Sequence, residues 1–312
     1  MASPHHIHHS RLRKKSHPVN LHRRFIELYI PIVICLSVIS VFAAYLIAFV
    51  ESQFAQVFET QKTEVSQIPS TVEKTLPSRP RGAIRVPILL YHYVEYVKDK
   101  GDTIRQSLDI VPHVFDEQLK TLVDANYTFL TASELADIID GKLALPRKPI
   151  LLTFDDGHWD LATDVLPILE KYHVKATAYI ISGFIGGRDF MTKEQLQDVI
   201  NSGLVEIGAH TVHHVALAGK LLPVVRLEVE NSKSDLENEY NIPIVSFAYP
   251  GGSFDGQAIN IVRNAGFRTA VSTVPGVEQS NSNRYFLFRI RPGYRVGREL
   301  LTYLEQSSFK PW

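Results

Sequence analysis

Two adjacent carboxylates, Asp155 and Asp156, end an apolar run of strand type at residues 149–152, and Gly157 follows them. Neighbouring side chains on a strand point to opposite faces, but a glycine permits a sharp turn that would bring both carboxylates into one pocket. One carboxylate could then bind a cation while the other handles a proton. A capped turn is the alternative interpretation, because Asp-Asp-Gly is also common turn chemistry.

A pair of histidines, His210 and His214, follows a second strand-like run at residues 204–209. Their spacing of four predicts that one helical turn places both imidazoles on one face, in reach of a single ion. Two histidines and one carboxylate, with open positions for water and substrate, are the ligands of a hydrolytic zinc site. Cobalt, nickel or iron would also accept this ligand set. The lone cysteine, Cys35, excludes a cysteine-rich zinc site.

A third strand-like run, Phe247-Ala248-Tyr249, ends in Pro250-Gly251-Gly252. Glycines allow a backbone N–H to approach a ligand closely, which an oxyanion site requires. Taken alone, Pro-Gly-Gly is also simply a turn.

The elements that must position these residues are strands alternating with amphipathic helices from Ile84 onward. One α/β domain with a barrel of parallel strands is therefore expected, with the working residues where strands end. Strands are predicted at 86–91, 150–154, 176–181, 204–208, 244–249 and 268–272, and helices at 112–126, 133–140 (opened by a cap at Ser133), 160–172, 192–202, 223–240 and 255–265.

The N-terminal part of the chain differs in composition. Residues 28–50 carry no charge, and this run is long enough to cross a bilayer core, which takes about 20 residues. The basic arm at 1–27 and the acidic residues that follow the run put the N-terminus in the cytoplasm and the rest outside. Residues 51–83 are polar with several prolines and predict a stalk, so the domain at 84–312 would be extracytoplasmic on a single-pass membrane anchor. A cleaved signal peptide is the alternative.

The charge balance limits the class of partner. Lys plus Arg and Asp plus Glu number 33 each, so the net charge is zero. Without a basic cluster beyond the N-terminal arm, a nucleic-acid partner is not expected for the folded part, and no protein partner is inferred.

Three motifs in order, Thr153-Phe154-Asp155-Asp156-Gly157, His210-Thr211-x-x-His214 and Phe247-Ala248-Tyr249-Pro250-x-Gly252, resemble the polysaccharide deacetylases of the NodB-homology type, carbohydrate esterase family 4. The resemblance covers about residues 84–296. It implies a distorted (β/α) barrel of about seven parallel strands and removal of acetyl groups from a polysaccharide with a divalent metal, usually zinc. By position, it makes Asp155 the general base, Asp156, His210 and His214 the metal ligands, and the Gly251 N–H the oxyanion donor.

Two features depart from the usual family pattern. The family's general acid is a late histidine, but this sequence has no histidine after His214. The opening Leu90-Tyr91-His92-Tyr93 resembles the poly-N-acetylglucosamine deacetylases, in which the domain is circularly permuted, so His92 is expected to be the acid. The second departure is Ala248, which stands where many members have an arginine that pairs with the catalytic aspartate; Arg289 is the expected substitute and Arg291 the second candidate.

Tyr91, Trp159, Tyr249 and Pro250 are expected to line the substrate site, with Trp159 stacking on a sugar ring. His158 and His213 are expected to be wall or surface residues. The predicted substrate is a polymer that contains N-acetylglucosamine, but the sequence leaves peptidoglycan, poly-N-acetylglucosamine, chitin-like oligomers and acetylated xylan open. Three other functions compete: a deformylase or deacylase of lipid-linked sugars, an inactive glycan-binding wall protein, and a zinc peptidase, which would usually show His-Glu-x-x-His.

Overall fold

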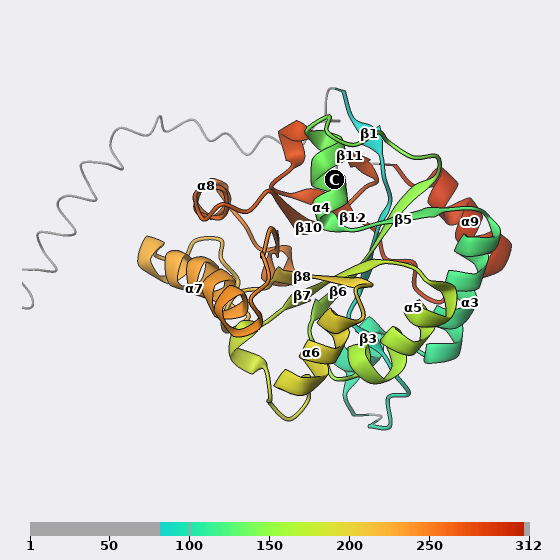
Figure 1. Cartoon of the computed structure of the whole chain (residues 1–312), viewed down its shortest axis with the longest axis horizontal. Helices are drawn as coiled ribbons and strands as arrows, with labels where there is room; N and C mark the ends of the chain where they lie inside the picture. Colours follow the sequence, from blue (N-terminus) through green and yellow to red (C-terminus); the bar gives the residue numbers. More distant parts are fainter. Residues whose placement is uncertain (1–81, 100, 309–312) are drawn as a thin grey trace, which may run out of the picture. The chain divides into compact units, whose positions relative to one another are not determined.

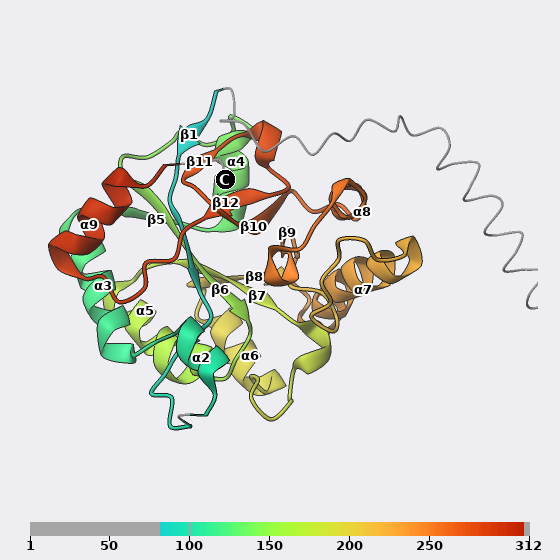
Figure 2. The same ribbon diagram turned by 180° about the vertical axis from the view of Figure 1, so that it is seen from behind.

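The computed structural model describes residues 82–99 and 101–308, which fold around a barrel of parallel strands (Figures 1 and 2). The expected arm at 1–27, the apolar run at 28–50 and all but the last two residues of the stalk at 51–83 lie outside the described residues. Within the described part, no helix is both long and apolar enough to span a bilayer. Seven strands form the barrel in the order β12-β10-β9-β8-β7-β6-β2. Their bounds are β2 (Ile88–Tyr91), β6 (Pro149–Asp156), β7 (Ala176–Ile180), β8 (Val205–Ala209), β9 (Ser246–Ala248), β10 (Thr269–Pro275) and β12 (Leu287–Arg289).

The two edges of this sheet meet. Ile290, which follows β12, forms a parallel bridge with Leu89 of β2, and it exchanges backbone hydrogen bonds with Ile88 and Leu90 at 2.9 Å each. The short strand β5 (Thr128–Leu130) pairs with the first residues of β6, where β7 has no partner residue. The barrel is therefore closed by its last strand, and the carboxyl ends of all seven strands face the same end.

Helices surround the barrel on its outside (Figure 1). Each predicted helix is present, but 160–172 is divided into a π-helical turn, η1 (Leu161–Val165), and α5 (Leu166–Tyr172). The short α2 and the C-terminal α9 were not predicted. The other helices are α2 (Thr103–Leu108), α3 (Pro112–Asp124), α4 (Ala132–Ile139), α6 (Lys193–Asn201), α7 (Leu222–Tyr240), α8 (Gly256–Asn264) and α9 (Gly297–Gln306).

Alternation along β6 decides which side chains reach the inside of the barrel. Leu151 packs in a cluster that fills the barrel, whereas Ile150, Leu152 and Phe154 pack in the larger cluster under the outer helices. Since side chains on a strand alternate between faces, Leu151, Thr153 and Asp155 share the inner face. In a parallel barrel, register partners lie on the same face, so this parity extends to the neighbouring strands.

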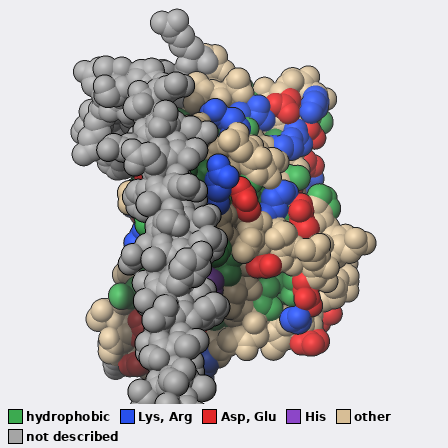
Figure 3. Space-filling model, turned by 90° about the vertical axis from the view of Figure 1, so that its left-hand side faces the viewer, with side chains coloured by type: hydrophobic (Ala, Val, Ile, Leu, Met, Phe, Trp, Pro, Cys, Tyr) green, Lys and Arg blue, Asp and Glu red, His purple; other side chains and the backbone are tan. Residues whose placement is uncertain are grey.

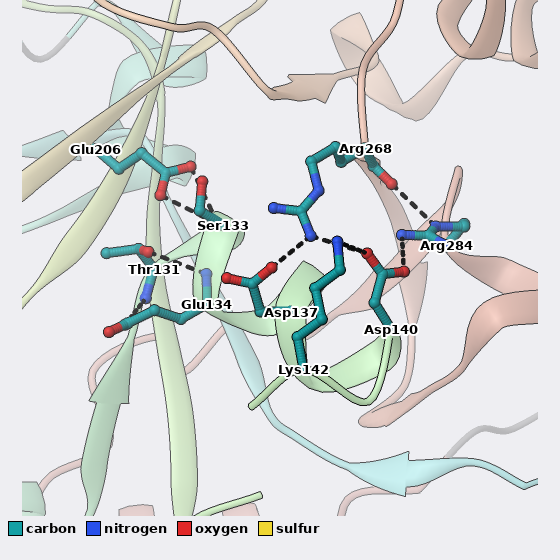
Figure 4. A network of polar contacts seen from close by, with 9 residues as sticks. All are labelled: Thr131, Ser133, Glu134, Asp137, Asp140, Lys142, Glu206, Arg268 and Arg284. Carbon is teal, nitrogen blue, oxygen red and sulfur yellow. Dashed lines mark hydrogen bonds and ion pairs between the residues drawn. The ribbon is translucent and has the colours of Figure 1, made fainter. Parts of the chain in front are cut away.

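The helix α4 closes the amino-terminal end of the barrel, because its residue Leu135 belongs to the inner cluster. Its cap is Thr131 rather than Ser133, and the expectation of a Ser cap is wrong. The Thr131 hydroxyl accepts from the Glu134 N–H and the Glu134 carboxylate accepts from the Thr131 N–H, a reciprocal capping box. The Ser133 N–H instead donates to Glu206 of β8 at 3.1 Å (Figure 4).

Ion pairs fasten the other end of α4 to the segments before β10 and β12. Arg268 contacts Asp137 at 2.6 Å and Asp140 at 2.9 Å, and Arg284 contacts the second oxygen of Asp140 at 2.9 Å (Figure 4). These contacts hold the pKa of Asp140 at about 2, mainly through the Arg268 hydrogen bond. Basic and acidic side chains are also interspersed on the visible part of the face in Figure 3. The ion pairs of Asp137 and Asp140 therefore attach α4 to the barrel at the end opposite to the carboxyl ends of the strands.

Candidate active site

The two adjacent carboxylates lie at the carboxyl end of β6, where the backbone departs from strand geometry. Asp155 continues the inner face, but Asp156 has φ 80° and Gly157 has φ 86°, both in the left-handed region. A left-handed aspartate is strained, and such strain concentrates at functional sites. The turn lets Asp156 reach the same end of the barrel as Asp155, as the sequence predicted.

Asp156, His210 and His214 form one group that could hold a metal ion, which we call the metal group. One ligand atom of each residue lies within 4.8 Å of the others. The Nε2 atoms of both histidines lie 3.3 Å from Asp156 Oδ1. That oxygen is buried and has no hydrogen-bond partner among the described residues. Two atoms bound tetrahedrally to zinc at about 2.0–2.1 Å lie about 3.3 Å apart, so the donor set fits a zinc-sized cation.

The tautomer of His210 also suits a metal ligand. Its Nδ1 lies 2.8 Å from the backbone oxygen of Ala248, to which only an N–H can donate. Nε2 is then left as the lone-pair donor that faces Asp156. Burial would lower the pKa of His210, but the adjacent Asp156 carboxylate and the charge of Asp155 raise it above its ordinary value. Burial and the charge of His210 lower the pKa of His214. Metal binding therefore competes with a proton at His210.

His210 and His214 do not lie on a helical turn, and the expectation of one is wrong. The connecting residues form a loop in which Thr211 has φ 65° and His214 has φ 56°. Glu228 of α7, which is buried, holds this loop: its Oε2 accepts the N–H groups of Val212 at 3.0 Å and His213 at 2.9 Å. Its Oε1 lies 2.9 Å from His213 Nδ1. Glu228 was not predicted from the sequence, although a charged residue on the buried face of a helix is a usable signal.

Arg289 lies against Asp155, as the sequence predicted. The guanidinium donates in parallel from Nη1 to Oδ1 and from Nη2 to Oδ2, at 2.7 Å each. Arg289 is only 2% exposed, and it also donates to the Ser272 carbonyl at 2.8 Å and the Thr153 hydroxyl at 3.1 Å. Ala248, where the usual arginine is missing, is buried inside the same barrel. The cation therefore comes from the last strand, β12, which closes the barrel against β2, and not from β9, where Ala248 lies.

This pair controls the charge of Asp155. Burial would raise the pKa of its carboxyl, but the charge of Arg289 and its hydrogen bonds outweigh burial and hold the pKa below the ordinary value. Asp155 is therefore ionised at neutral pH. The second candidate, Arg291, is exposed and two residues further toward the mouth of the barrel.

His92 follows β2 at the same end of the barrel. Its imidazole is close enough to Asp155 and Asp156 for their charges to act on it, and it makes no hydrogen bond to any residue the structure describes. Burial lowers the pKa of His92 to about 4, although both carboxylates oppose this shift. The ring is thus neutral at pH 7, and the expected role of general acid, which stays a prediction, requires that His92 take up a proton during the reaction.

A cavity of about 770 Å³ opens beside the metal group. Trp159 lines it together with Tyr93 and His158, and the stacking of Trp159 on a sugar ring stays a prediction. His158 is a wall residue, one of the two expected places for it: it is buried, its ring stacks on Tyr93 with centroids 4.1 Å apart, and its Nε2 lies 3.4 Å from Asp156 Oδ2. His158 therefore connects the cavity to Asp156, while Asp155, Asp156, His210 and His214 do not themselves line it.

Three expected substrate contacts do not fit the structure. Tyr91 is the register partner of Phe154, so its side chain points outward, where it stacks on Phe154 and donates to Gln118 at 3.0 Å. Tyr249 lies on the outer face with Phe247 and is fully buried, and Pro250 is buried too. Strand parity, read from the inward Asp155, excludes both tyrosine side chains as sugar contacts.

The turn at Pro250–Gly252 presents Gly251 at the surface with φ 59°. This left-handed conformation favours glycine. A side chain at this position would meet nothing within 4 Å, so the backbone of Gly251 is open to a ligand.

Comparison with known proteins gives consistent matches. A model of the family described as polysaccharide deacetylase matches residues 142–270. The protein YxkH of Bacillus subtilis (strain 168) is 29% identical over 207 residues, which cover 66% of this chain and 71% of YxkH. A poly-beta-1,6-N-acetyl-D-glucosamine N-deacetylase of Staphylococcus aureus (strain MSSA476) is 26% identical over 189 residues, 56% of this chain and 65% of that protein.

Among solved structures, the Streptococcus pyogenes deacetylase PplD in complex with acetate superposes with a TM-score of 0.66 at 28% identity, covering 73% of this chain and all of that one. The family model begins after His92 and ends before Arg289. The family match therefore does not include these two residues, and it is the barrel that places both of them near Asp155.

Proposed function

We propose that this chain is a metal-dependent N-deacetylase of an extracytoplasmic polymer that contains N-acetylglucosamine. The match of residues 142–270 to the polysaccharide deacetylase family supports this proposal. The observation that carries the proposal is one juxtaposition. An ionised Asp155, held by Arg289, lies beside the group of Asp156, His210 and His214. In that group the oxygen between the two histidines, Asp156 Oδ1, has no hydrogen-bond partner among the described residues. A base next to a cation site is the arrangement that hydrolysis of an amide requires.

Asp156, His210 and His214 would hold the divalent metal, most simply zinc. When bound, the metal would lower the pKa of a water molecule and polarise the acetyl carbonyl. Asp155 takes a proton from the attacking water, since Arg289 keeps it ionised and fixed in orientation. The Gly251 N–H is the second donor to the oxygen that becomes negative; loss of such a donor costs about 3 kcal/mol of barrier.

His92 completes the proton transfers. It is neutral before substrate binds, so it takes up a proton from solvent when negative charge develops beside it in the reaction, and Asp155 returns its own proton to solvent at the end of the cycle. It then donates that proton to the departing sugar nitrogen, which cannot leave as an anion. Acetate and a glucosamine unit are the products. The neighbouring sugars of the polymer lie in the cavity beside Trp159, whose ring is suited to stacking on a sugar face.

Acetate release from the purified full chain tests this function. The panel contains peptidoglycan, poly-N-acetylglucosamine, chitin oligomers and acetylated xylan, each with and without a chelator. We expect release of acetate from an N-acetylglucosamine polymer, its loss on chelation, and its return when zinc is added. Formate release from a lipid-linked sugar would instead identify a deformylase, and polymer binding without any release would identify a glycan-binding protein.

We also propose that residues 28–50 anchor the protein in a membrane with residues 84–312 outside the cytoplasm. The uncharged run and the basic arm before it support this orientation. We expect the chain in the membrane fraction of cells, with its C-terminal part digested by protease added from outside. Recovery of the chain in the soluble fraction, or protection of the C-terminal part, would contradict the proposed orientation.

A further inference from the structure

Asp160 is a buried carboxylate that neither the metal group nor the proposed proton transfers use. It is 1% exposed and lies four residues after Asp156, at the start of η1. Its Oδ2 accepts the backbone N–H of Val94 at 2.6 Å, and its Oδ1 has no hydrogen-bond partner among the described residues. Burying a carboxylate costs free energy that one hydrogen bond only partly offsets. Its position therefore calls for a reason.

Val94 belongs to the segment that carries His92. This His92 segment, residues 92–95, leaves the barrel after β2 and contains the short strand β3 (Tyr93–Val94). The Tyr93 ring stacks on His158 with centroids 4.1 Å apart, and the Arg105 guanidinium lies 4.6 Å from the centroid of the same ring. One hydrogen bond and one ring stack thus join the His92 segment to the loop that follows Asp155 and Asp156.

His92 itself depends on this backbone. Because its imidazole makes no hydrogen bond to another described residue, its place beside Asp155 is set by where the chain runs on either side of it. On the N-terminal side, β2 is fixed by the barrel. On the C-terminal side, the Tyr93 ring stacks on His158, and the bond from the Val94 N–H to Asp160 is the nearest hydrogen bond from the backbone to the loop that follows Asp156.

We propose that Asp160 is a positioning residue that holds His92 at the distance from which it can donate a proton to the leaving nitrogen. The inference rests on the proposed function, since it supposes that His92 is the donor. Asp160 would touch neither substrate nor metal. It would act only through the backbone of Val94, and its loss should therefore affect only the step that His92 serves.

Two substrates separate this role from a general structural one. An N-acetylglucosamine oligomer has an amine leaving group that needs a proton, whereas 4-nitrophenyl acetate releases a stable anion that needs none. In the full chain loaded with zinc, we expect Asp160→Ala to lower kcat on the oligomer by about 10²-fold, the cost of roughly 1 Å of misplacement. Its kcat on the ester should stay near that of the unchanged chain.

Asp160→Asn keeps an oxygen that can accept the Val94 N–H but removes the charge, so its loss on the oligomer should be less than about tenfold. Zinc content and the melting temperature are measured for both variants. The matched control is Asp198→Ala, because Asp198 is an exposed aspartate on α6, and this variant should not change either activity. If Asp160→Ala does not fold, Asp160→Asn carries the test, since its smaller loss must again fall on the oligomer and not on the ester.

His92→Ala distinguishes failure of the inference from failure of the proposed function. His92→Ala should itself lose activity on the oligomer and keep it on the ester, and adding Asp160→Ala to it should cause little further loss. If His92→Ala shows no such selectivity, the proposed acid is wrong. If His92→Ala is selective but Asp160→Ala lowers both activities equally, or neither, then Asp160 does not position His92.

Discussion

Asp155→Asn will lower kcat on an N-acetylglucosamine polymer by roughly 10²–10⁴-fold, the range that general-base catalysis contributes, while the protein keeps its metal. The reason is that an amide cannot take the proton from the attacking water. The metal group is separate: its ligand atoms belong to Asp156, His210 and His214. Acetate release and zinc content, measured on the same preparation of the full chain, check both halves of the expectation.

The matched control for this variant is His210→Ala, which removes a metal ligand but leaves the base. It should lose both zinc and turnover, and excess zinc should not restore full activity. Full activity of zinc-loaded Asp155→Asn would show that another group is the base. Loss of zinc from Asp155→Asn would show that Asp155 also takes part in metal binding and is not the general base alone.

Arg289→Met will destabilise the domain by about 3–5 kcal/mol, because it leaves the buried charge of Asp155 without its partner. Methionine has a similar length but no charge and no donors, so the bonds to Ser272 and Thr153 are lost as well. For a domain of this size, the melting temperature should fall by roughly 10 °C. Thermal unfolding followed by circular dichroism measures this shift.

The size of this loss should depend on pH, with a sign set by Asp155. In the unchanged chain its pKa lies below the ordinary value, so the pair contributes stability above about pH 3.9 that is lost as the pH falls through the folded-state pKa. In Arg289→Met the main opposition to burial is removed, so the pKa of Asp155 rises. The variant therefore loses stability as the pH rises through that value. The difference in melting temperature should be larger at pH 8 than at pH 4, and the acid limb of the activity profile should move to higher pH.

The double variant Asp155→Asn with Arg289→Met provides the control. With the buried charge removed from both sides, it should regain part of the stability that Arg289→Met loses, and its stability should lose the added pH dependence. An equal loss at pH 4 and pH 8 in the single variant would mean that Arg289 acts through packing rather than through the charge of Asp155.

The site also explains why some expectations from the sequence hold and others do not. Asp155-Asp156-Gly157 and His210-x-x-x-His214 carry their chemistry in residue type, and both follow apolar runs that had to become strands. Tyr91 and Tyr249 stand next to the motifs in sequence, but parity places both rings under the outer helices. The register that pairs Tyr91 with Phe154 was needed to see this.

The sequence alone determined the alternation of strands and helices, the metal-binding residue types and the family resemblance, because these depend on residue type and short spacing. Tertiary structure decided which distant residues meet. Arg289 reaches Asp155, 134 positions earlier, because β12 closes the barrel against β2. Glu228 accepts backbone N–H groups of the loop before His214, and Asp160 accepts the N–H of Val94, close to His92. Almost every residue type has a backbone N–H, so no sequence motif marks these contacts. Such contacts follow from chain closure and burial, and these are properties of the folded chain.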